Sequence, residues 1–302
     1  MFSSLRRQLI LICVVIVALA MSAVVLVNFI TVRSHTLDSL NQQIYQLSQS
    51  HAAGITEWVH SKEAAVASMR PAVQDANPML VVKAAEQSGG FDLAYIGFAD
   101  KRSVFSQERK RAADYDVTAR PWYIKAAAAG GPIITSPYIG ASTGKLVVTF
   151  ADPIGPKGNT TAVAAADVIL TVVVANVNSI KPTPNSFAFL FDGDGKVIAH
   201  PDAAMTLKSV TALDGGLTLQ SLDDTAQSGL SSPVTLHGRD AMVYVTKVEG
   251  TDWSLATVVD HAEATQALSA MVISSALTAI AGIVLAGLGL MMLVRRVLVD
   301  WE

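Results

Sequence analysis

The segment between Tyr115 and Tyr123 has several aromatic residues close to one arginine, and it is the first candidate for a binding site. Pro121 favours a helix start, because proline is tolerated in the first helical turn, so Arg120 and Tyr123 would share a helix face. The guanidinium offers two donors to a carboxylate, and the rings, Trp122 included, offer flat walls for an apolar or cationic body. The alternative is a surface arginine beside core aromatics.

Asp167 is the second unusual residue, because it lies inside the apolar run 162–170. A buried carboxylate is costly unless a cation meets it. That cation is either Arg120, in a purely structural ion pair, or the ammonium group of a ligand. Together the two residues offer one positive and one negative pole, as a zwitterionic α-amino acid requires. Tyr138 is a further aromatic residue near a strand end.

Signals for catalysis or metal binding are missing from the sequence. The turn 192–195, Asp-Gly-Asp-Gly, lacks the further oxygen ligands, the glycine and the closing glutamate of a calcium loop. The six histidines form no pair at i,i+4 spacing, and no nucleophile elbow, phosphate loop or paired-acid set is present. We therefore predict a protein that is not an enzyme and that uses no cofactor and no metal.

The apolar residues concentrate at the two ends of the chain. Overall 51% of the 302 residues are apolar and 16% are charged, and the runs 9–30 and 267–294 contain no charge. About 20 apolar residues suffice to cross a bilayer as a helix. This pattern excludes a cytosolic enzyme and a multi-span transporter, and a net charge of −3 argues against nucleic-acid binding.

The flanking charges predict the orientation in the membrane. Arginines precede the first run and follow the second, so residues 1–8 and 295–302 are expected in the cytoplasm, with transmembrane helices at 9–30 and 267–294. The segment between them would then face the periplasm or the cell exterior, anchored in the inner membrane. A cleavable signal peptide is the alternative, but the apolar run continues past its possible cleavage site. The single cysteine, Cys13, lies in the first run, which excludes disulfides from the exported segment.

The exported segment reads as α+β. Apolar residues at helical spacing predict one long stalk helix over 31–71, which either supports a homodimer or packs on its own domain. Beyond a short helix that begins at Asn77-Pro78 and ends at Gly89-Gly90, two groups of five antiparallel strands are expected, in modules at 72–180 and 181–266. The expected strands are 91–98, 103–106, 133–136, 145–152 and 161–172, then 186–191, 197–200, 234–236, 241–248 and 253–259.

These features resemble a bacterial transmembrane receptor with a double Cache (dCache) sensor domain, most like methyl-accepting chemotaxis proteins. The resemblance includes the long helix, two PAS-like modules, the Ser-Pro-Tyr…Thr-Gly…Thr-x-x-x-Pro-Ile pattern at 136–154 and the later Asp-Trp-Ser-Leu. The amino-acid-sensing branch has the spacing Tyr-x4-Arg-x-Trp-Tyr followed by a distant aspartate, which this chain meets at Tyr115, Arg120, Trp122, Tyr123 and Asp167.

That resemblance implies a role for each residue. The arginine and the tryptophan indole, Arg120 and Trp122, would bind the carboxylate of the ligand. Tyr123 and Asp167 would bind its ammonium group, and Tyr138 would be a further pocket aromatic. Many relatives carry an acidic residue where this chain has Gly140, so one ammonium contact is missing here.

Several readings of the function remain open. Receptors of this family continue into a HAMP linker and a cytoplasmic signalling module, whereas this sequence ends at Glu302. The leading expectation is the ligand-sensing part of a chemoreceptor for an L-amino acid. The alternatives are a sensor of quaternary or biogenic amines or of small carboxylates, the input domain of a sensor kinase or cyclic-dinucleotide enzyme, and a structural protein with an empty pocket.

Overall fold

The computed structural model describes residues 2–109, 111–112, 114–141, 144–214, 216–236 and 238–299, and the side chains of some residues in its first and last helices fall outside that set. The chain divides into two compact units, Met1–Gln43 with His261–Glu302, and Ile44–Asp260. Two residues of the turn expected at 142–144, and the last three of the expected cytoplasmic segment 295–302, lie outside the described residues.

The first unit is helical. It contains the beginning of α1 (Phe2–Ala67) and α6 (His261–Val299). The two helices approach each other at Gly282, where an added Cβ would lie 2.6 Å from Cε of Met21, so a larger residue would require that methionine side chain to move. Over the described residues, no helix has a stretch that is both long and apolar enough to cross a membrane. The expected transmembrane helices at 9–30 and 267–294 include side chains outside that set.

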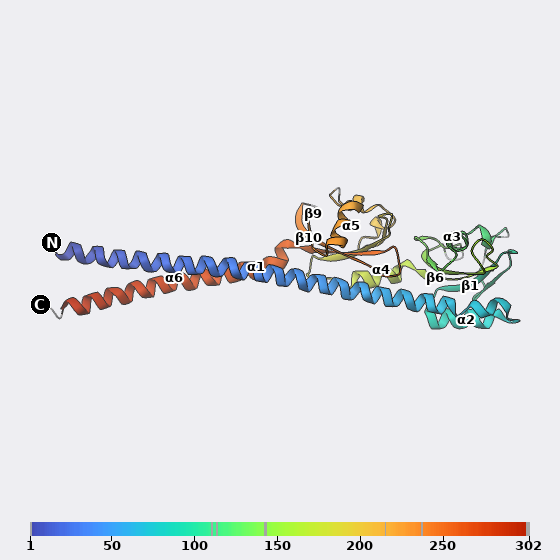
Figure 1. Ribbon diagram of the computed structural model, residues 1–302, viewed down its shortest axis with the longest axis horizontal. Coiled ribbons are helices and arrows are strands. Elements are labelled where there is room, and N and C mark those ends of the chain that lie inside the picture. The colour runs from blue at the N-terminus through green and yellow to red at the C-terminus, as the bar shows by residue number, and fades with distance from the viewer. Residues whose placement is uncertain are drawn as a thin grey trace. The chain divides into compact units, whose positions relative to one another are not determined.

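The second unit is built on the remainder of α1, along which two sheets follow one another (Figure 1). A 3-10 turn, η1 (Arg70–Gln74), ends the long helix where Arg70-Pro71 predicts. Arg70 donates two hydrogen bonds of 2.5 Å, from Nε and Nη2, to the carboxylate of Asp152. Helix α2 (Pro78–Gly89) starts at a proline and ends at Gly90, whose φ of 58° is left-handed, a conformation that glycine adopts without steric cost.

The first sheet has six strands among the described residues, all antiparallel to their neighbours. Its order is β2-β1-β6-β5-β3, with β4 paired to β5. The strands are β1 (Leu93–Phe98), β2 (Ser103–Phe105), β3 (Ile133–Ile134), β4 (Tyr138–Ile139), β5 (Leu146–Ile154) and β6 (Ala162–Ile169). Between β2 and β3 the chain forms η2 (Val117–Ala119) and α3 (Pro121–Ala129).

Alternation along the strands gives this sheet two different faces. On β6, Ala164 and Ala166 belong to the core shared with α1 and α2, whereas Val163 and Ala165 belong to the core under α3. Since Asp167 is two residues beyond Ala165, it faces the α3 side as well. Small residues on β6 leave room on that side for the rings carried by α3 and β1.

The second sheet has five described strands in the order β8-β7-β11-β10-β9. They are β7 (Phe187–Phe191), β8 (Val197–Ala199), β9 (Ser232–Leu236), β10 (Arg239–Lys247) and β11 (Ser254–Asp260). One face shares the core along α1 and α4 (Leu170–Asn178), so a single apolar cluster runs under both sheets. The other face packs under η3 (Ala203–Met205), η4 (Val210–Ala212) and α5 (Leu219–Ser228).

The α+β class and the two antiparallel sheets on a long helix are confirmed, with three differences of detail. The strand expected at 161–172 ends at Ile169, because Leu170, Val173 and Val177 bury one face of α4 at helical spacing. Helix α5 was not expected and begins at a capping box formed by Thr218 and Ser221. The first sheet has a sixth strand: the strand expected at 133–136 is limited to β3, and β4 follows it as a separate short strand paired with β5.

Candidate ligand-binding site

A pocket on the α3 face of the first sheet brings most of the predicted site residues together. Its lining comprises Leu93, Tyr95, Phe105, Tyr115, Arg120, Trp122, Tyr138, Ala141 and Asp167. Five of the six predicted residues are therefore neighbours in space although they span 53 positions of sequence from first to last. The sixth, Tyr123, is buried beside the pocket and packs edge-on against Trp122, with ring centres 5.6 Å apart.

The start of α3 positions Arg120. This residue is the N-cap, with extended backbone at φ −83° and ψ 147°, and Pro121 occupies the first helical position as the sequence predicts. Just before it, Asp116 accepts the backbone N–H of Thr118 at 2.9 Å and pairs with Lys101 at 2.8 Å. The hydrogen bond from Lys101 is the first cause of the lowering of the pKa of Asp116 to about 2. The segment leading to Arg120 is thereby tied to the turn after β1.

Asp167 lies in the middle of a chain of hydroxyl groups. Its Oδ1 accepts hydrogen bonds from the Tyr95 hydroxyl at 2.6 Å and the Thr149 hydroxyl at 2.7 Å, and Thr149 is 2.7 Å from the hydroxyl of Tyr138. The register explains the contacts, since Thr149 and Leu93 are directly opposite Asp167 on either side. Tyr95 is two residues beyond Leu93 and reaches across the diagonal. Four strands thus contribute to one polar chain.

Burial governs the charge of Asp167, whose residue is only 6% exposed. Desolvation raises the pKa of Asp167 to about 6, against the opposing effect of the hydrogen bonds from Thr149 and Tyr95. Asp92 raises it further and Arg109 lowers it, but those two groups form their own ion pair at 2.8 Å. At neutral pH the pocket therefore holds a carboxylate that is mostly ionised and has no cationic partner of its own among the described residues.

Arg120 is the positive pole of the pocket. Within the part of the chain that the structure describes, it forms no ion pair, and its guanidinium carbon lies 5.8 Å from the centre of the Tyr115 ring. A structural Arg120–Asp167 pair, one of the readings left open by the sequence, is not among the described ion pairs. The two charges line one pocket and do not neutralise each other there.

Aromatic rings form the wall between the two charges. Trp122, which is 1% exposed, packs edge-on against Tyr95 with ring centres 4.9 Å apart. Burial is the main cause of the raised pKa of Tyr115, and the positive charges of Arg120 and Arg111 act against it. Trp122 and Tyr95 therefore form an aromatic wall of the pocket.

The pocket encloses about 10 Å³, which is room for roughly one water molecule. A larger ligand requires the lining to separate. Ala141 belongs to the lining and follows Gly140, which is buried and donates its N–H to the carbonyl of Lys145 at 2.8 Å. The position at which many relatives carry an acid is thus adjacent to the pocket wall, and here it offers no side chain.

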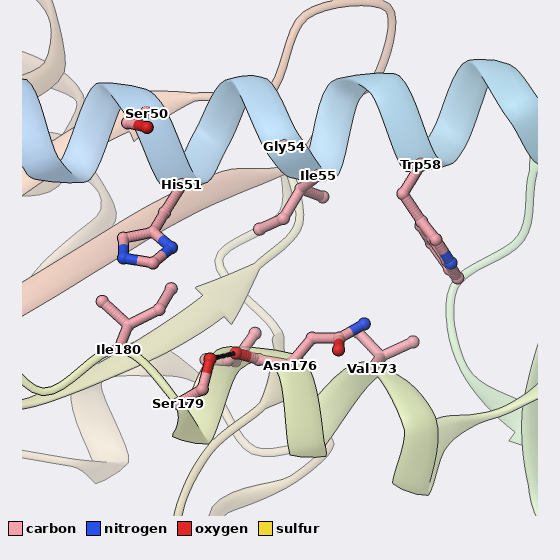
Figure 2. A pocket seen from close by; sticks show the side chains of 10 residues that line it. Ser50, His51, Gly54, Ile55, Trp58, Val173, Asn176, Ser179 and Ile180 are labelled. Atoms are coloured by element: carbon pink, nitrogen blue, oxygen red, sulfur yellow. Dashed lines mark hydrogen bonds between the residues drawn. The ribbon is translucent and has the colours of Figure 1, made fainter.

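A roomier hollow, of about 340 Å³, lies between α1 and α4. Figure 2 shows His51, Ile55 and Trp58 pointing from α1 toward α4, where Ser179 donates to the carbonyl of Asn176 at 2.7 Å. No aspartate, glutamate, lysine or arginine lines it. Because it lacks a pair of opposite charges, we take the smaller pocket as the candidate site.

Tyr95 and Thr149 are the two functional candidates that the sequence did not identify. Both are ordinary residues in apolar strands, and only strand pairing brings them to Asp167. The signal that points to them is a polar side chain on the same face as a buried carboxylate. Phe105, Leu93 and Ala141 complete the lining without a recognisable sequence signal.

Comparison with known proteins places this fold among chemoreceptor ligand-binding domains. The ligand-binding domain of the Pseudomonas fluorescens chemoreceptor CtaA, in complex with L-isoleucine, aligns with a TM-score of 0.68 at 23% identity, over 78% of this chain and 98% of that one. The ligand-binding domain of the Pseudomonas aeruginosa amino acid chemoreceptor PctB, in complex with L-Arg, aligns with a TM-score of 0.65 at 24% identity, over 75% and 97%. At such identities the likeness shows the fold.

Residues 31–268 match dCache_1, described as a Cache domain, and the chain therefore belongs to the dCache_1 family. Methyl-accepting chemotaxis protein PscA of Pseudomonas syringae pv. tomato is 32% identical over 209 residues, which cover 68% of this chain and 33% of PscA. Methyl-accepting chemotaxis protein PctB is 27% identical over 304 residues, which cover 98% of this chain and 47% of PctB. The chain thus spans at most about half the length of these relatives.

Proposed function

We propose that this chain is the extracytoplasmic sensor part of a chemoreceptor and that it binds an L-amino acid on the α3 face of its first sheet. The single observation that carries the proposal is the pair of charges in one pocket. Arg120 has no ionic partner among the described residues, and Asp167 is buried with hydroxyl partners only. A zwitterionic ligand would pair with both charges at once. In a purely structural role, the two charges would be expected to pair with each other or with neighbouring side chains.

The roles follow the resemblance and the geometry together. Arg120 and Trp122 bind the carboxylate of the ligand, with the guanidinium fork and the indole N–H as donors. Asp167 accepts from the ammonium group, oriented by Tyr95 and Thr149. Tyr138 closes the sheet side of the pocket. Tyr123, which the resemblance also assigns to the ammonium, contributes through its contact with Trp122 unless opening of the pocket exposes its hydroxyl.

Binding acts on the second sheet through groups that join the two sheets. Ser136, two residues before Tyr138, donates to Asp192 at 3.3 Å, and Asp192 holds the turn between β7 and β8 by accepting the N–H of Lys196 at 2.9 Å. The apolar cluster along α1 and α4 is also common to both sheets. A ligand signals only by binding one arrangement of these contacts more tightly than another.

Calorimetric titration of the purified chain with the proteinogenic amino acids tests the proposal. At least one is expected to bind, and Arg120→Ala should weaken its binding about 100-fold or more, because the ligand carboxylate loses the two guanidinium donors and the positive charge. Arg102→Ala is the matched control, since Arg102 is an exposed arginine in the turn between β1 and β2 that pairs with Asp100. Unchanged binding by Arg120→Ala would contradict the two-pole site.

The same proposal includes two helices that span the inner membrane, at 9–30 and 267–294, with both ends of the chain on the cytoplasmic side. It is supported by the uncharged runs, the flanking arginines and exposed large apolar side chains, among them Leu19, Val27 and Leu285. The receptor is a homodimer through its long helix, and its signalling module lies beyond this chain.

Cysteine labelling tests this topology, because Cys13 is the only thiol and can be replaced by serine. A cysteine at Ser209, the exposed N-cap of η4, should react with a membrane-impermeant maleimide in intact spheroplasts, whereas one at Ser3 should react only after lysis. The reverse pattern would contradict the orientation. Cross-linking through single cysteines on the exposed face of 31–71 tests the dimer.

A further inference from the structure

Arg111 is a half-buried cation beside the pocket with no role in the site described above. Its guanidinium carbon lies 3.3 Å from the centre of the Phe105 ring and 6.0 Å from that of Tyr115. Nη1 donates to the carbonyl of Arg109 at 3.3 Å. The other two nitrogens, Nε and Nη2, are buried and have no hydrogen-bond partner among the described residues.

The two unpartnered nitrogens of Arg111 form the edge of the guanidinium group that commonly binds carboxylates in proteins. Nε and Nη2 form the side of the guanidinium from which two parallel donors reach a carboxylate. Arg70 uses the same two nitrogens to hold Asp152 in this protein. The Phe105 ring covers the flat face of the Arg111 guanidinium and does not cover the edge formed by Nε and Nη2. An unpaired buried donor is costly, and here two of them belong to one charged group.

Neighbouring charges do not compensate Arg111. Asp92 and Gln107 are already bound to Arg109, so the carboxylate of Asp92 is not available to Arg111. Burial lowers the pKa of Arg111; of the smaller influences, Tyr115 raises it, Arg109 lowers it and Tyr95 raises it. Both tyrosines line the pocket, as does Phe105. Because Arg111 lies over Phe105 and near Tyr115, its charge is next to the ligand site.

Tyr115 lies near both cations, Arg120 and Arg111. Its ring centre is 5.8 Å from the guanidinium carbon of Arg120 and 6.0 Å from that of Arg111. An α-amino acid without a charged side chain balances Arg120 and Asp167 and leaves Arg111 uncompensated. A ligand with one ammonium and two carboxylates balances all three.

We infer that Arg111 binds a second acid group of the ligand, so that the receptor prefers α-amino dicarboxylic acids over their neutral amides. The inference rests on the proposed function, because it adds a third charge contact to the same pocket. Arg120 and Asp167 hold the two groups common to all amino acids, and Arg111 selects the side chain.

The test compares L-glutamate with L-glutamine and L-aspartate with L-asparagine, pairs that differ in charge and barely in shape. In calorimetric titrations of the purified 302-residue chain, each acid is expected to bind about 10- to 100-fold more tightly than its amide, the range of one hydrogen-bonded charge contact. Arg111→Gln should reduce this ratio toward one by weakening the acids, with the amides changed less than about twofold.

Two further variants keep the result interpretable. Arg102→Gln removes a positive charge from the turn between β1 and β2, where Arg102 likewise lies over a phenylalanine, 4.6 Å from the Phe98 ring centre, and it should leave the ratio unchanged. Arg111→Lys keeps the charge and the stacking stem but loses the two-donor edge, so an intermediate ratio is expected. This variant also serves if Arg111→Gln proves unstable in a thermal melt.

The outcomes separate the two proposals. A wild-type chain that binds amides as tightly as acids, or an acid preference that persists in both Arg111 variants, overturns the inference and leaves the amino-acid sensor intact. Failure of every proteinogenic amino acid to bind overturns the proposed function, and this inference with it. A preference lost with Arg111 and retained in Arg102→Gln supports both.

Discussion

The two sheets of the second unit have the same topology but very different interiors. Each sheet has its first two strands as a hairpin at one edge, with the last strand beside the hairpin and two earlier strands beyond it, in the orders β2-β1-β6-β5-β3 and β8-β7-β11-β10-β9. The first sheet has β4 in addition, paired with β5. Both bury one face on the helices below and the other under a short covering helix. Any difference at matching positions is therefore independent of the fold.

Strand pairing identifies the matching positions. Asp167 is paired with Leu93 and Thr149, and Val258 is paired with Phe187 and Val243 in the same way. One step along, Tyr95 corresponds to Phe189, since each pairs with an alanine two residues before the central position. The polar set of the first sheet, Tyr95, Asp167 and Thr149, thus corresponds to Phe189, Val258 and Val243 in the second.

The comparison teaches that the buried carboxylate is not needed to build this sheet. The second sheet fills the same positions with apolar side chains, all within one core cluster. The first sheet maintains a charge whose pKa is raised by burial and supplies it with hydroxyl donors. A costly group kept where the fold does not require it marks a binding site.

Placing a carboxylate at the matching position of the second sheet should give the largest effect. Val258→Asp would bury a charge without the donors that Asp167 has, and we expect the free energy of unfolding to fall by about 3–5 kcal/mol at pH 7.5. Chemical denaturation measures this, with Val258→Ala as the control for lost volume. A loss no greater than that of the alanine variant would mean that the second sheet tolerates a charge equally well.

Neutralising the carboxylate of the first sheet should have opposite effects on binding and stability. Asp167→Asn keeps an acceptor for Tyr95 and Thr149 but loses the charge, so amino-acid binding should weaken about 100-fold or more. Because burial raises the pKa of Asp167 from 3.8 to about 6, the wild type loses about 3 kcal/mol by keeping it ionised, and the variant should be more stable by up to that amount at pH 7.5.

The sign of this stability difference follows from proton binding. Between about pH 4 and pH 6 the folded chain holds a proton on Asp167 that the unfolded chain releases, so this group lowers the free energy of unfolding as the pH rises through that window. Denaturation at several pH values should show the advantage of Asp167→Asn growing from pH 4 to pH 6 and constant above. A constant advantage at all pH values would contradict the raised pKa.

Ligand affinity should depend on pH in the opposite direction. The ammonium group requires an ionised Asp167, so affinity should be about tenfold lower at pH 5 than at pH 7.5, as expected for a group with a pKa of about 6. Titrations at pH 6 in buffers of different ionisation enthalpy should detect proton release on binding. Equal affinities at the two pH values would assign the ammonium contact to another residue.

Converting the hydroxyl partners to their counterparts in the second sheet should give the smallest effect. Tyr95→Phe and Thr149→Val each remove one hydrogen bond to the ionised carboxylate, so each should raise the pKa of Asp167 and move the midpoint of the affinity profile upward by about one pH unit. The two changes matched to Phe189 and Val243 should act in the same direction. A midpoint that stays in place would show that the hydroxyls only fill space.

Local signals in the sequence were sufficient for much of this fold. The α+β class, the long helix ending at Arg70-Pro71, the start of α3 at Pro121 and most strand positions follow from periodicity and from proline or glycine at element ends. Helix α4 did not, because its β-branched run favours a strand locally and only its buried face against α1 and the sheets decides otherwise.

The candidate site likewise has a part that local sequence predicts and a part that depends on tertiary structure. The sequence by itself determined the Arg120 segment and the anomaly of Asp167, since both depend on residue type and nearest neighbours. Tertiary structure alone decided that Tyr95 and Thr149 meet that carboxylate, and that Arg111 has a free edge beside the pocket. Register and stacking join residues far apart in the chain, and no short-range pattern encodes which strand lies beside which.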